Sequence, residues 1–405
     1  MKTALVRPEL PRQPHRGTCD LRDRTILLIS PQAWDHIAVS KHHYAIELAR
    51  RGNRVYFLEP PHPTGSRSVS LRPSDHAGLT VVRFRPRFPG ALRFHARALF
   101  DRLMRAECSR ISAAIRRPID IVWSFESNLY ADLRSFGGAL TIFHPVDPLP
   151  RPEQVRPAAS ADAVFSVSHD ILDTVRSLTD RSWFLNHALS TDFARIATRS
   201  SPEAPRTTGR LRVGYVGNLL HPSLDRAIFR QIVTGMPGVE FHVWGPCAGT
   251  TLDEDRATFV RFMRDAANVR LHGPTPSAQL AEGIQGVDAF LLAYRHGAST
   301  YDSSNSHKLL EYLSTGKVVV SSRLSVYADR RDLLVMPQDG DNRHLPRLLT
   351  KALADLATHN APDRVAHRRN FALEHTYARQ LDRVAHVLGS LDTLPERIAR
   401  PRGDR

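Results

Sequence analysis

The feature that most constrains the fold of this chain is a regular alternation of short apolar runs with amphipathic segments. An apolar run at residues 25–30 is followed by a helical segment at residues 40–52 and by a second apolar run at residues 54–59. Short continuous apolar runs are typical of strands that are buried on both faces, and a helix between two such strands makes them parallel. The sequence therefore predicts an α/β fold with doubly wound parallel sheets.

The same alternation continues through both halves of the chain. In the amino-terminal half, further strands are predicted at residues 79–84, 119–124, 140–143, 163–167 and 183–185. In the carboxyl-terminal half, strands are predicted at residues 211–216, 239–244, 269–271, 289–292, 318–321 and 333–335. A final helical pattern covers residues 365–391.

A chain of 405 residues suits two domains, which the proline-, serine- and threonine-rich segment near residue 200 would separate. The expected parts are a disordered leader (1–23), an amino-terminal doubly wound domain (24–194), a linker (195–210), a carboxyl-terminal doubly wound domain (211–375), a helix (376–395) and a flexible tail (396–405). The cleft between the two domains is the expected ligand site.

Composition narrows the class of protein further. The charge of +15, from 56 basic against 41 acidic residues, favours anionic partners. No apolar stretch is long enough to span a membrane, and the charged, proline-containing first residues do not form a signal sequence. Cys19, Cys108 and Cys247 show neither disulfide nor zinc spacing. We therefore expect a cytoplasmic protein with no metal.

The basic charge is densest at residues 81–117, where ten arginines alternate with phenylalanine and leucine. This composition is typical of a helix that lies on an anionic lipid surface. The alternative is a helix that packs on the sheet and exposes a solvated arginine face. No nucleic-acid-binding motif accompanies the charge, so we do not expect a nucleic-acid partner.

Residues 303–320 (SSNSHKLLEYLSTGKVVV) hold the densest polar motif of the chain. The pattern predicts a helix that begins near Ser306 and ends at Gly316, with Lys308 in its first turn. A helix start together with a lysine suits a diphosphate, and Glu311, on the same face, suits a ribose. The alternative is an ordinary amphipathic helix with a surface ion pair between Lys308 and Glu311.

This motif, together with the turn VGYVGNL at residues 213–219, resembles glycosyltransferases of the GT-B fold. The segment that begins TILLISPQAWD resembles bacterial transferases that build surface polysaccharides. The resemblance covers residues 24–391 and implies two Rossmann-like domains facing a central cleft, with a nucleotide sugar, first of all a UDP-sugar, in the carboxyl-terminal half. It implies that Lys308 contacts the donor diphosphate and Glu311 the ribose. Gly217, Asn218 and Ser306 would line the same donor site.

Two departures favour the inverting branch of this fold. Ser303 stands where many retaining members carry a glutamate, and Asn218 and His221 stand where a basic pair often holds the diphosphate. The segment at residues 302–310 resembles the inverting glucuronosyltransferase of xanthan assembly.

The same comparison implies a catalytic base. Residues 125–127 (FES) and 141–149 (TIFHPVDPL) resemble the amino-terminal half of that inverting enzyme, whose base matches Asp147. Inverting transfer needs one group to take the proton of the acceptor hydroxyl. His144 is a second candidate base on the same loop, and Glu126 is a candidate at the edge of the cleft. The alternative for Asp147 is a turn-capping role.

On the acceptor side, Trp34, Asp35 and His36 follow the first strand, where an acceptor would enter. Trp34 either stacks on a sugar ring or packs in the core. The acidic triplet at residues 253–255 is interpreted as a helix start rather than a metal site.

These observations predict a hexosyl- or glycuronosyltransferase that acts on a glycan or lipid-linked acceptor in surface polysaccharide biosynthesis. It would work in the cytoplasm or on the inner face of the cytoplasmic membrane. The alternatives are a nucleotide-sugar 2-epimerase of the same fold and a non-catalytic protein that binds membranes or polyanions.

Overall fold

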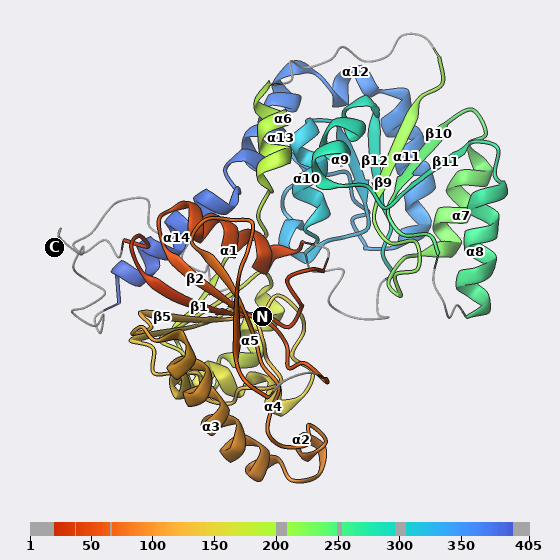
Figure 1. The fold of residues 1–405 in the computed structure, drawn as a ribbon. Helices are drawn as coiled ribbons and strands as arrows, with labels where there is room; N and C mark the ends of the chain where they lie inside the picture. Colours follow the sequence, from red (N-terminus) through yellow and green to blue (C-terminus); the bar gives the residue numbers. More distant parts are fainter. Residues whose placement is uncertain are drawn as a thin grey trace, which may run out of the picture. The chain divides into compact units, whose positions relative to one another are not determined.

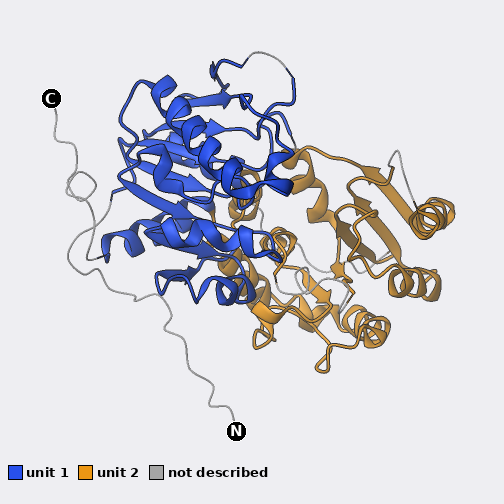
Figure 2. Ribbon diagram, turned by 90° about the horizontal axis from the view of Figure 1, so that it is seen from below, with its two compact units in different colours: residues 1–186, 377–405 blue, residues 187–376 orange. Residues whose placement is uncertain are grey.

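The computed structural model describes residues 20–36, 38–64, 67–199, 209–248, 253–295 and 305–391. The chain divides into two compact units, coloured separately in Figure 2. Unit 1 consists of Met1–Asn186 and Tyr377–Arg405, and unit 2 consists of His187–Thr376. Each unit is built on a sheet of mainly parallel strands with helices against it (Figure 1), which confirms the predicted α/β class.

Unit 1 contains an eight-stranded sheet. Its strands lie in the order β3 (Ser70–Pro73), β4 (Leu79–Arg83), β2 (Arg54–Leu58), β1 (Thr25–Ile29), β5 (Ile121–Ser124), β6 (Leu140–Phe143), β7 (Ala163–Ser166) and β8 (Ser182–Phe184). β3, which the sequence pattern did not reveal, pairs antiparallel with β4 at the edge. Its four residues are all exposed, so it lacks the apolar run by which the other strands were predicted.

Helices cover both faces of this sheet. They are α1 (Ser40–Arg50), α2 (Leu92–His95), α3 (Arg97–Ile115), α4 (Pro152–Val155), α5 (His169–Val175) and α14 (Tyr377–Gly389), with 3₁₀ turns at Leu133–Phe136 and Arg156–Ser160. Figure 1 shows α1 and α14 on one face and α3 on the other. Because β2 and β5 flank β1 on opposite sides, the carboxyl ends of β1 and β5 form a topological switch point, where ligands bind in open α/β sheets.

Unit 2 contains a five-stranded, fully parallel sheet. Its order is β11 (Val269–Gly273), β10 (Glu240–Trp244), β9 (Arg212–Val216), β12 (Ala289–Leu292) and β13 (Val318–Ser321). Its helices are α6 (Thr191–Arg199), α7 (Arg226–Gly235), α8 (Glu254–Asp265), α9 (Ser277–Gly283), α10 (Lys308–Thr315), α11 (Leu345–Ala354), α12 (Leu356–His359) and α13 (Pro362–Leu373). Short 3₁₀ turns lie at Ile284–Gly286, Ser325–Tyr327 and Asn342–His344. The strand expected at residues 333–335 is only a single bridge between Val320 and Val335.

The boundaries between parts differ from those expected. Leu21, placed in the expected leader, is buried, and its carbonyl accepts a hydrogen bond from Asn53; residues 1–19 lie outside the described residues. α6 continues to Arg199, beyond the expected start of the linker at residue 195, because Phe193 and Ala197 bury one face of the helix. Residues 200–208 and 392–405, which hold the rest of that linker and the expected tail, are also outside the described residues.

Candidate functional site

In unit 2, Tyr312 fixes α10 against the carboxyl end of β9. The Tyr312 hydroxyl accepts a hydrogen bond from the Val216 N–H at 2.7 Å and donates one to the Val216 carbonyl at 3.2 Å. The Tyr312 ring stacks on Phe290, with 4.3 Å between ring centroids. Because Lys308 precedes Tyr312 by one helical turn, both side chains project from the same face of α10.

The Lys308 ammonium therefore lies beside the turn that follows β9. Its side chain is 9% exposed, and Nζ donates a hydrogen bond to Tyr294 Oη at 2.9 Å. Nζ also lies 5.7 Å from the centre of the Tyr215 ring. A Cβ added to Gly217, whose φ is +155°, would lie 2.5 Å from Nζ, so a side chain at this position would displace the end of the lysine. Burial works to lower the pKa of Lys308, but Tyr215, Tyr294 and Glu311 together raise it.

Glu311 lies one position before Tyr312 and is partly exposed. Burial raises the pKa of its carboxyl to about 7, while the Lys308 charge works to lower it. Within the described part of the chain, the Glu311 carboxylate forms no hydrogen bond and no ion pair. At neutral pH the Glu311 carboxyl is therefore partly protonated and partly ionised, and it is available to bind a ligand.

The helix begins slightly later than expected. α10 starts at Lys308 with His307 as the N-cap, and no side chain of a described residue caps it. Ser306 is buried, and its carbonyl accepts a hydrogen bond from the Leu309 N–H at 3.1 Å. The positive end of the α10 dipole lies at Lys308, an arrangement that suits an anion. Asp302 and Ser303 lie outside the described residues.

Asn218 shapes the turn after β9. Its Oδ1 accepts a hydrogen bond from the Leu220 N–H at 2.8 Å, so the side chain acts within its own loop. Arg226, which is buried, donates to the His221 carbonyl at 2.9 Å and pairs with Asp255 at 3.0 Å. The acidic triplet starts α8 as expected, with Asp253 as the N-cap.

Sequence reasoning missed Tyr215 and Tyr294, which lie against Lys308. Tyr215 lies in β9, and Tyr294 follows β12. Tyr215 was part of a run assigned to the sheet and Tyr294 comes just after such a run, so their polar atoms were not considered. A tyrosine at the carboxyl end of a buried parallel strand is the signal that could have found them.

In unit 1, three charged residues follow β1, β5 and β6 at the carboxyl edge of the sheet. They are Lys41, Glu126 and Asp147. Lys41, which the sequence analysis overlooked, is 3% exposed and forms no hydrogen bond or ion pair with any described residue. Burial lowers its pKa, against the opposing charges of Asp147 and Glu126. Burial also raises the pKa of Glu126, whose Oε1 accepts a hydrogen bond from the Asn128 N–H. Asp147 is exposed.

His144 lies deeper than Asp147. It is 1% exposed and stacks on Phe125, with 4.7 Å between ring centroids. Its Nδ1 accepts a hydrogen bond from Trp123 Nε1 at 3.4 Å. This aromatic enclosure favours a structural role for His144 and leaves Asp147 as the better-placed candidate base.

The acceptor-side residues Trp34, Asp35 and His36 lie together after β1. Trp34 is half-buried, and its ring packs edge-on against the Phe57 ring, with 4.9 Å between ring centroids. Asp35 is exposed and pairs with Arg83 at 2.8 Å and Arg72 at 3.1 Å. The hydrogen bond from Arg83 is the main cause of its lowered pKa. His36 is exposed.

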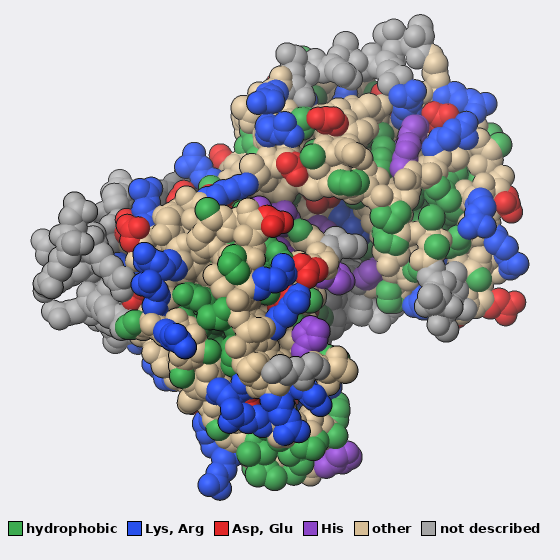
Figure 3. All heavy atoms as spheres, in the orientation of Figure 1, with side chains coloured by type: hydrophobic (Ala, Val, Ile, Leu, Met, Phe, Trp, Pro, Cys, Tyr) green, Lys and Arg blue, Asp and Glu red, His purple; other side chains and the backbone are tan. Residues whose placement is uncertain are grey.

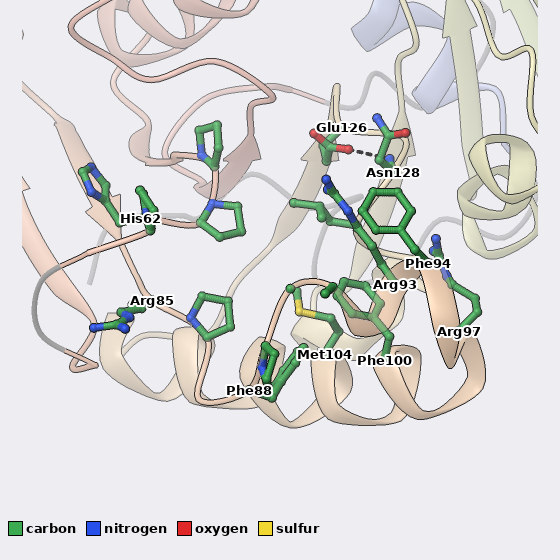
Figure 4. Close-up of a pocket in the computed structure, with 18 of the residues that line it drawn as sticks. His62, Arg85, Phe88, Arg93, Phe94, Arg97, Phe100, Met104, Glu126 and Asn128 are labelled. Carbon is green, nitrogen blue, oxygen red and sulfur yellow. Dashed lines mark hydrogen bonds between the residues drawn. The ribbon is translucent and has the colours of Figure 1, made fainter.

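A pocket of about 1000 Å³ opens at the carboxyl ends of β2, β4 and β5 in unit 1 (Figure 4). Glu126 and Asn128 line one side of it, and the loop before α3 lines the other. Within the described ranges, no three histidine, cysteine or acidic side chains gather as a metal site would require. None of the helices described is both long and apolar enough to cross a membrane.

Comparisons with known proteins agree with this arrangement. Residues 222–386 match a family model described as glycosyl transferase-like. No curated protein sequence matches the chain. The match to solved structures covers nearly the whole chain: an E. coli trehalose-6-phosphate protein bound with UDP-2-fluoro glucose has a TM-score of 0.61 and 15% identity, with 90% of this chain and 98% of that chain covered.

Two further solved structures share the fold. An α,α-trehalose-phosphate synthase (UDP-forming) from Burkholderia xenovorans, in complex with glucose-6-phosphate, has a TM-score of 0.62 and 16% identity, with coverages of 89% and 99%. A sucrose-phosphate synthase from Thermosynechococcus elongatus has a TM-score of 0.61 and 13% identity, with coverages of 88% and 96%. The fold that the sequence motifs implied is thereby confirmed: the chain has the GT-B fold, and residues 222–386 resemble a glycosyl transferase-like domain.

Proposed function

We propose that the protein transfers a hexosyl or glycuronosyl group from a UDP-sugar to a glycan or lipid-linked acceptor in bacterial surface polysaccharide biosynthesis, with inversion at the anomeric carbon. The observation that carries the proposal is the buried Lys308 ammonium beside Gly217 at the start of α10. A cation and the positive end of a helix dipole at one point suit the diphosphate of a nucleotide sugar. The UDP-2-fluoro glucose held by the E. coli relative supports uridine as the base.

The proposed reaction uses side chains of both units. In unit 2, Lys308 would neutralise the diphosphate as it leaves, and Glu311 would accept hydrogen bonds from the ribose. In unit 1, Asp147 would take the proton of the acceptor hydroxyl while that oxygen bonds to the anomeric carbon and the bond from this carbon to the diphosphate oxygen breaks. UDP and the glycosylated acceptor are the products. The metal-free reaction expected from the sequence remains part of the proposal.

The surface formed by α2 and α3 is the proposed contact with the membrane. Phe94 is 64% exposed and Leu99 is 47% exposed, and arginines 93, 102 and 105 are exposed beside them. Figure 3 shows hydrophobic and basic side chains gathered over these two helices. Apolar side chains flanked by arginines suit the boundary of an anionic lipid layer, where a lipid-linked acceptor would be presented.

The donor site is tested by thermal shift with UDP, GDP, ADP and dTDP on the wild type and on Lys308→Ala. A ligand at about one hundred times its dissociation constant stabilises the native state by roughly 2.7 kcal/mol. We expect UDP to raise the melting temperature of the wild type but not that of the variant. Lys351→Ala, which removes an exposed lysine of α11, is the matched control. If no nucleotide stabilises the wild type, the donor site is not where Lys308 lies.

A further inference from the structure

We propose that the pocket in unit 1 holds the acceptor, and that the acceptor is an anionic amphiphile in which a phosphate joins the sugar to a hydrocarbon chain. This inference rests on the proposed transferase function and selects between its two acceptor classes. It comes from the combination of three features in one pocket: apolar walls, an excess of arginine and contact with the edge that carries the proposed base.

The pocket is large and lies next to the switch point of the sheet. Its walls come from the segments 60–63, 85–104, 126–129 and 151–153, all of which follow strands at their carboxyl ends or belong to the helices after them. Its volume of about 1000 Å³ is at the upper end of ordinary ligand pockets, which span roughly 300–1,000 Å³. A hexose phosphate alone would leave much of this space unfilled.

Much of the wall is apolar. Phe100 and Met104 of α3, each 2% exposed, form one side, and Phe88 packs edge-on against Phe100 at 5.6 Å. Phe94 of α2, labelled in Figure 4, also lines the pocket and is 64% exposed. Leu129 and several prolines complete the apolar lining. An apolar lining of this extent would remove a hydrocarbon chain from water, which stabilises a bound amphiphile more than a free sugar.

The polar lining is strongly basic. The lining contains two glutamates, Glu126 and Glu153, and six arginines. The arginines are residues 67, 85, 87, 93, 97 and 151. Glu153 is already paired with Arg151 at 3.5 Å. The Arg93 guanidinium lies over the Phe94 ring at 4.5 Å and forms no ion pair with any described residue.

Arg97 offers an unused donor. Its Nε donates to Asp101 at 2.9 Å, but its Nη2 is buried without a hydrogen-bond partner in the part of the chain described. A buried donor without a partner is costly, and a phosphate oxygen would relieve that cost. The charge excess and this donor point to an anionic group at the α2–α3 side of the pocket.

The pocket also reaches the edge that carries the proposed base. Glu126 lines the pocket, and both Glu126 and Asp147 act electrostatically on the buried Lys41. A ligand with its chain against Phe88 and Phe100 and its phosphate on the arginines would extend its sugar toward Glu126. The acceptor hydroxyl would then be delivered to the side of unit 1 where Asp147 lies.

The test measures binding of four probes by isothermal titration calorimetry: farnesyl monophosphate below its micelle concentration, farnesol, glucose 6-phosphate and inorganic phosphate. We expect farnesyl monophosphate to bind at least tenfold more tightly than each of the other three. Equal binding of farnesol would show that the arginines do not contribute. Tighter binding of glucose 6-phosphate would identify a sugar-phosphate acceptor. Either result overturns the proposal.

Variants separate the pocket from general surface charge. Arg93→Glu and Arg87→Glu should each weaken farnesyl monophosphate binding at least tenfold, whereas Arg117→Glu, at an exposed arginine outside the pocket and outside the proposed membrane contact, should not. Equal loss in Arg117→Glu would mean that the lipid phosphate is held by net charge alone, which contradicts a pocket. The UDP-induced thermal shift is recorded for every variant. If UDP stabilises the protein but farnesyl monophosphate fails to bind, only the acceptor inference falls; if UDP itself has no effect, the proposed function falls.

Discussion

At Gly217, a single hydrogen in place of a side chain decides how close the lysine of α10 comes to the end of β9. A Cβ there would lie 2.5 Å from Lys308 Nζ and 2.9 Å from Tyr215 Oη. We predict that Gly217→Ala displaces the ammonium and weakens UDP binding roughly tenfold, which corresponds to about 1.4 kcal/mol. Titration calorimetry with UDP measures the change.

A double-mutant cycle shows whether this effect passes through the lysine. In a Lys308→Ala background, Gly217→Ala should cost little further UDP affinity, because the two changes remove the same interaction. Gly235→Ala, at a position where an added Cβ meets nothing within 4 Å, should leave affinity unchanged. Additive losses in the double variant would mean that Gly217 acts on the backbone of the turn and not on Lys308.

Glu311 provides a pH-dependent signature of its environment. Burial raises its pKa from 4.5 to about 7, so the folded protein retains a proton that the unfolded chain releases. The stability linked to this proton is fully present below pH 4.5 and is lost as the pH rises to about 7. We therefore predict that the melting temperature of Glu311→Gln, relative to the wild type, increases between pH 5 and pH 8.

The comparison needs only melting curves of the ligand-free protein across this pH range. Glu282→Gln, which changes an exposed glutamate of α9, should show a difference from the wild type that does not vary with pH. A pH-independent difference for Glu311→Gln as well would show that its carboxyl is not held in a desolvated environment.

At the scale of elements, the first turn of α1 brings an ammonium to the carboxyl ends of β5 and β6. Lys41 is buried there without a described partner, and the charges of Glu126 and Asp147 act on it. We infer a positioning role in which the Lys41 ammonium orients the Asp147 carboxylate. Lys41→Met should lower kcat at least tenfold, Lys41→Arg should restore part of that loss, and both variants should keep the UDP-induced thermal shift.

The fold should tolerate this change, since removing a buried ammonium in favour of an apolar side chain of similar length is often neutral or stabilising. Lys351→Met is the matched control on an exposed helix face. A reduced kcat in Lys41→Met that Lys41→Arg does not restore would assign Lys41 to packing, and an unchanged kcat would exclude the positioning role.

The elements themselves were largely predictable, because strands such as β1 and β12 are buried along their whole length and so read as unbroken apolar runs. Lys308 and Glu311 were predictable for a different reason: both belong to one local motif at a helix start. The pairing of Lys308 with Tyr294, by contrast, joins residues from separate elements, and no local pattern encodes it. Lys41 was missed because an exposed lysine and a buried one look alike in a helical pattern.

At the scale of the whole molecule, the chain passes from unit 1 to unit 2 after Asn186 and returns after Thr376. Within unit 2 the two connections lie together, since the Leu189 N–H donates to the His375 carbonyl at 2.8 Å. The returning helix α14 completes unit 1: Gln380 donates to the Asn186 carbonyl at 2.8 Å, and Arg51 of α1 donates to the Ala378 carbonyl at 2.6 Å. The sequence pattern separated a helix at residues 376–395 from the carboxyl-terminal domain, but helical periodicity does not reveal which sheet that helix covers.

The division of the two carboxyl-terminal helices yields a reciprocal prediction. Leu381 of α14 and Leu349 of α11 are both 0% exposed, and replacing either by alanine should cost about 2–5 kcal/mol of local stability. Leu381→Ala should accelerate amide hydrogen exchange in β1 and β5 of unit 1, whereas Leu349→Ala should accelerate it in β9 and β12 of unit 2. Exchange is read by mass spectrometry, with Leu178→Ala, at a leucine that is 41% exposed, as the control. If Leu381→Ala instead accelerated exchange in β9 and β12, α14 would be stabilising unit 2. The two units would then unfold together, with the sequence-adjacent helices α13 and α14 acting as one element.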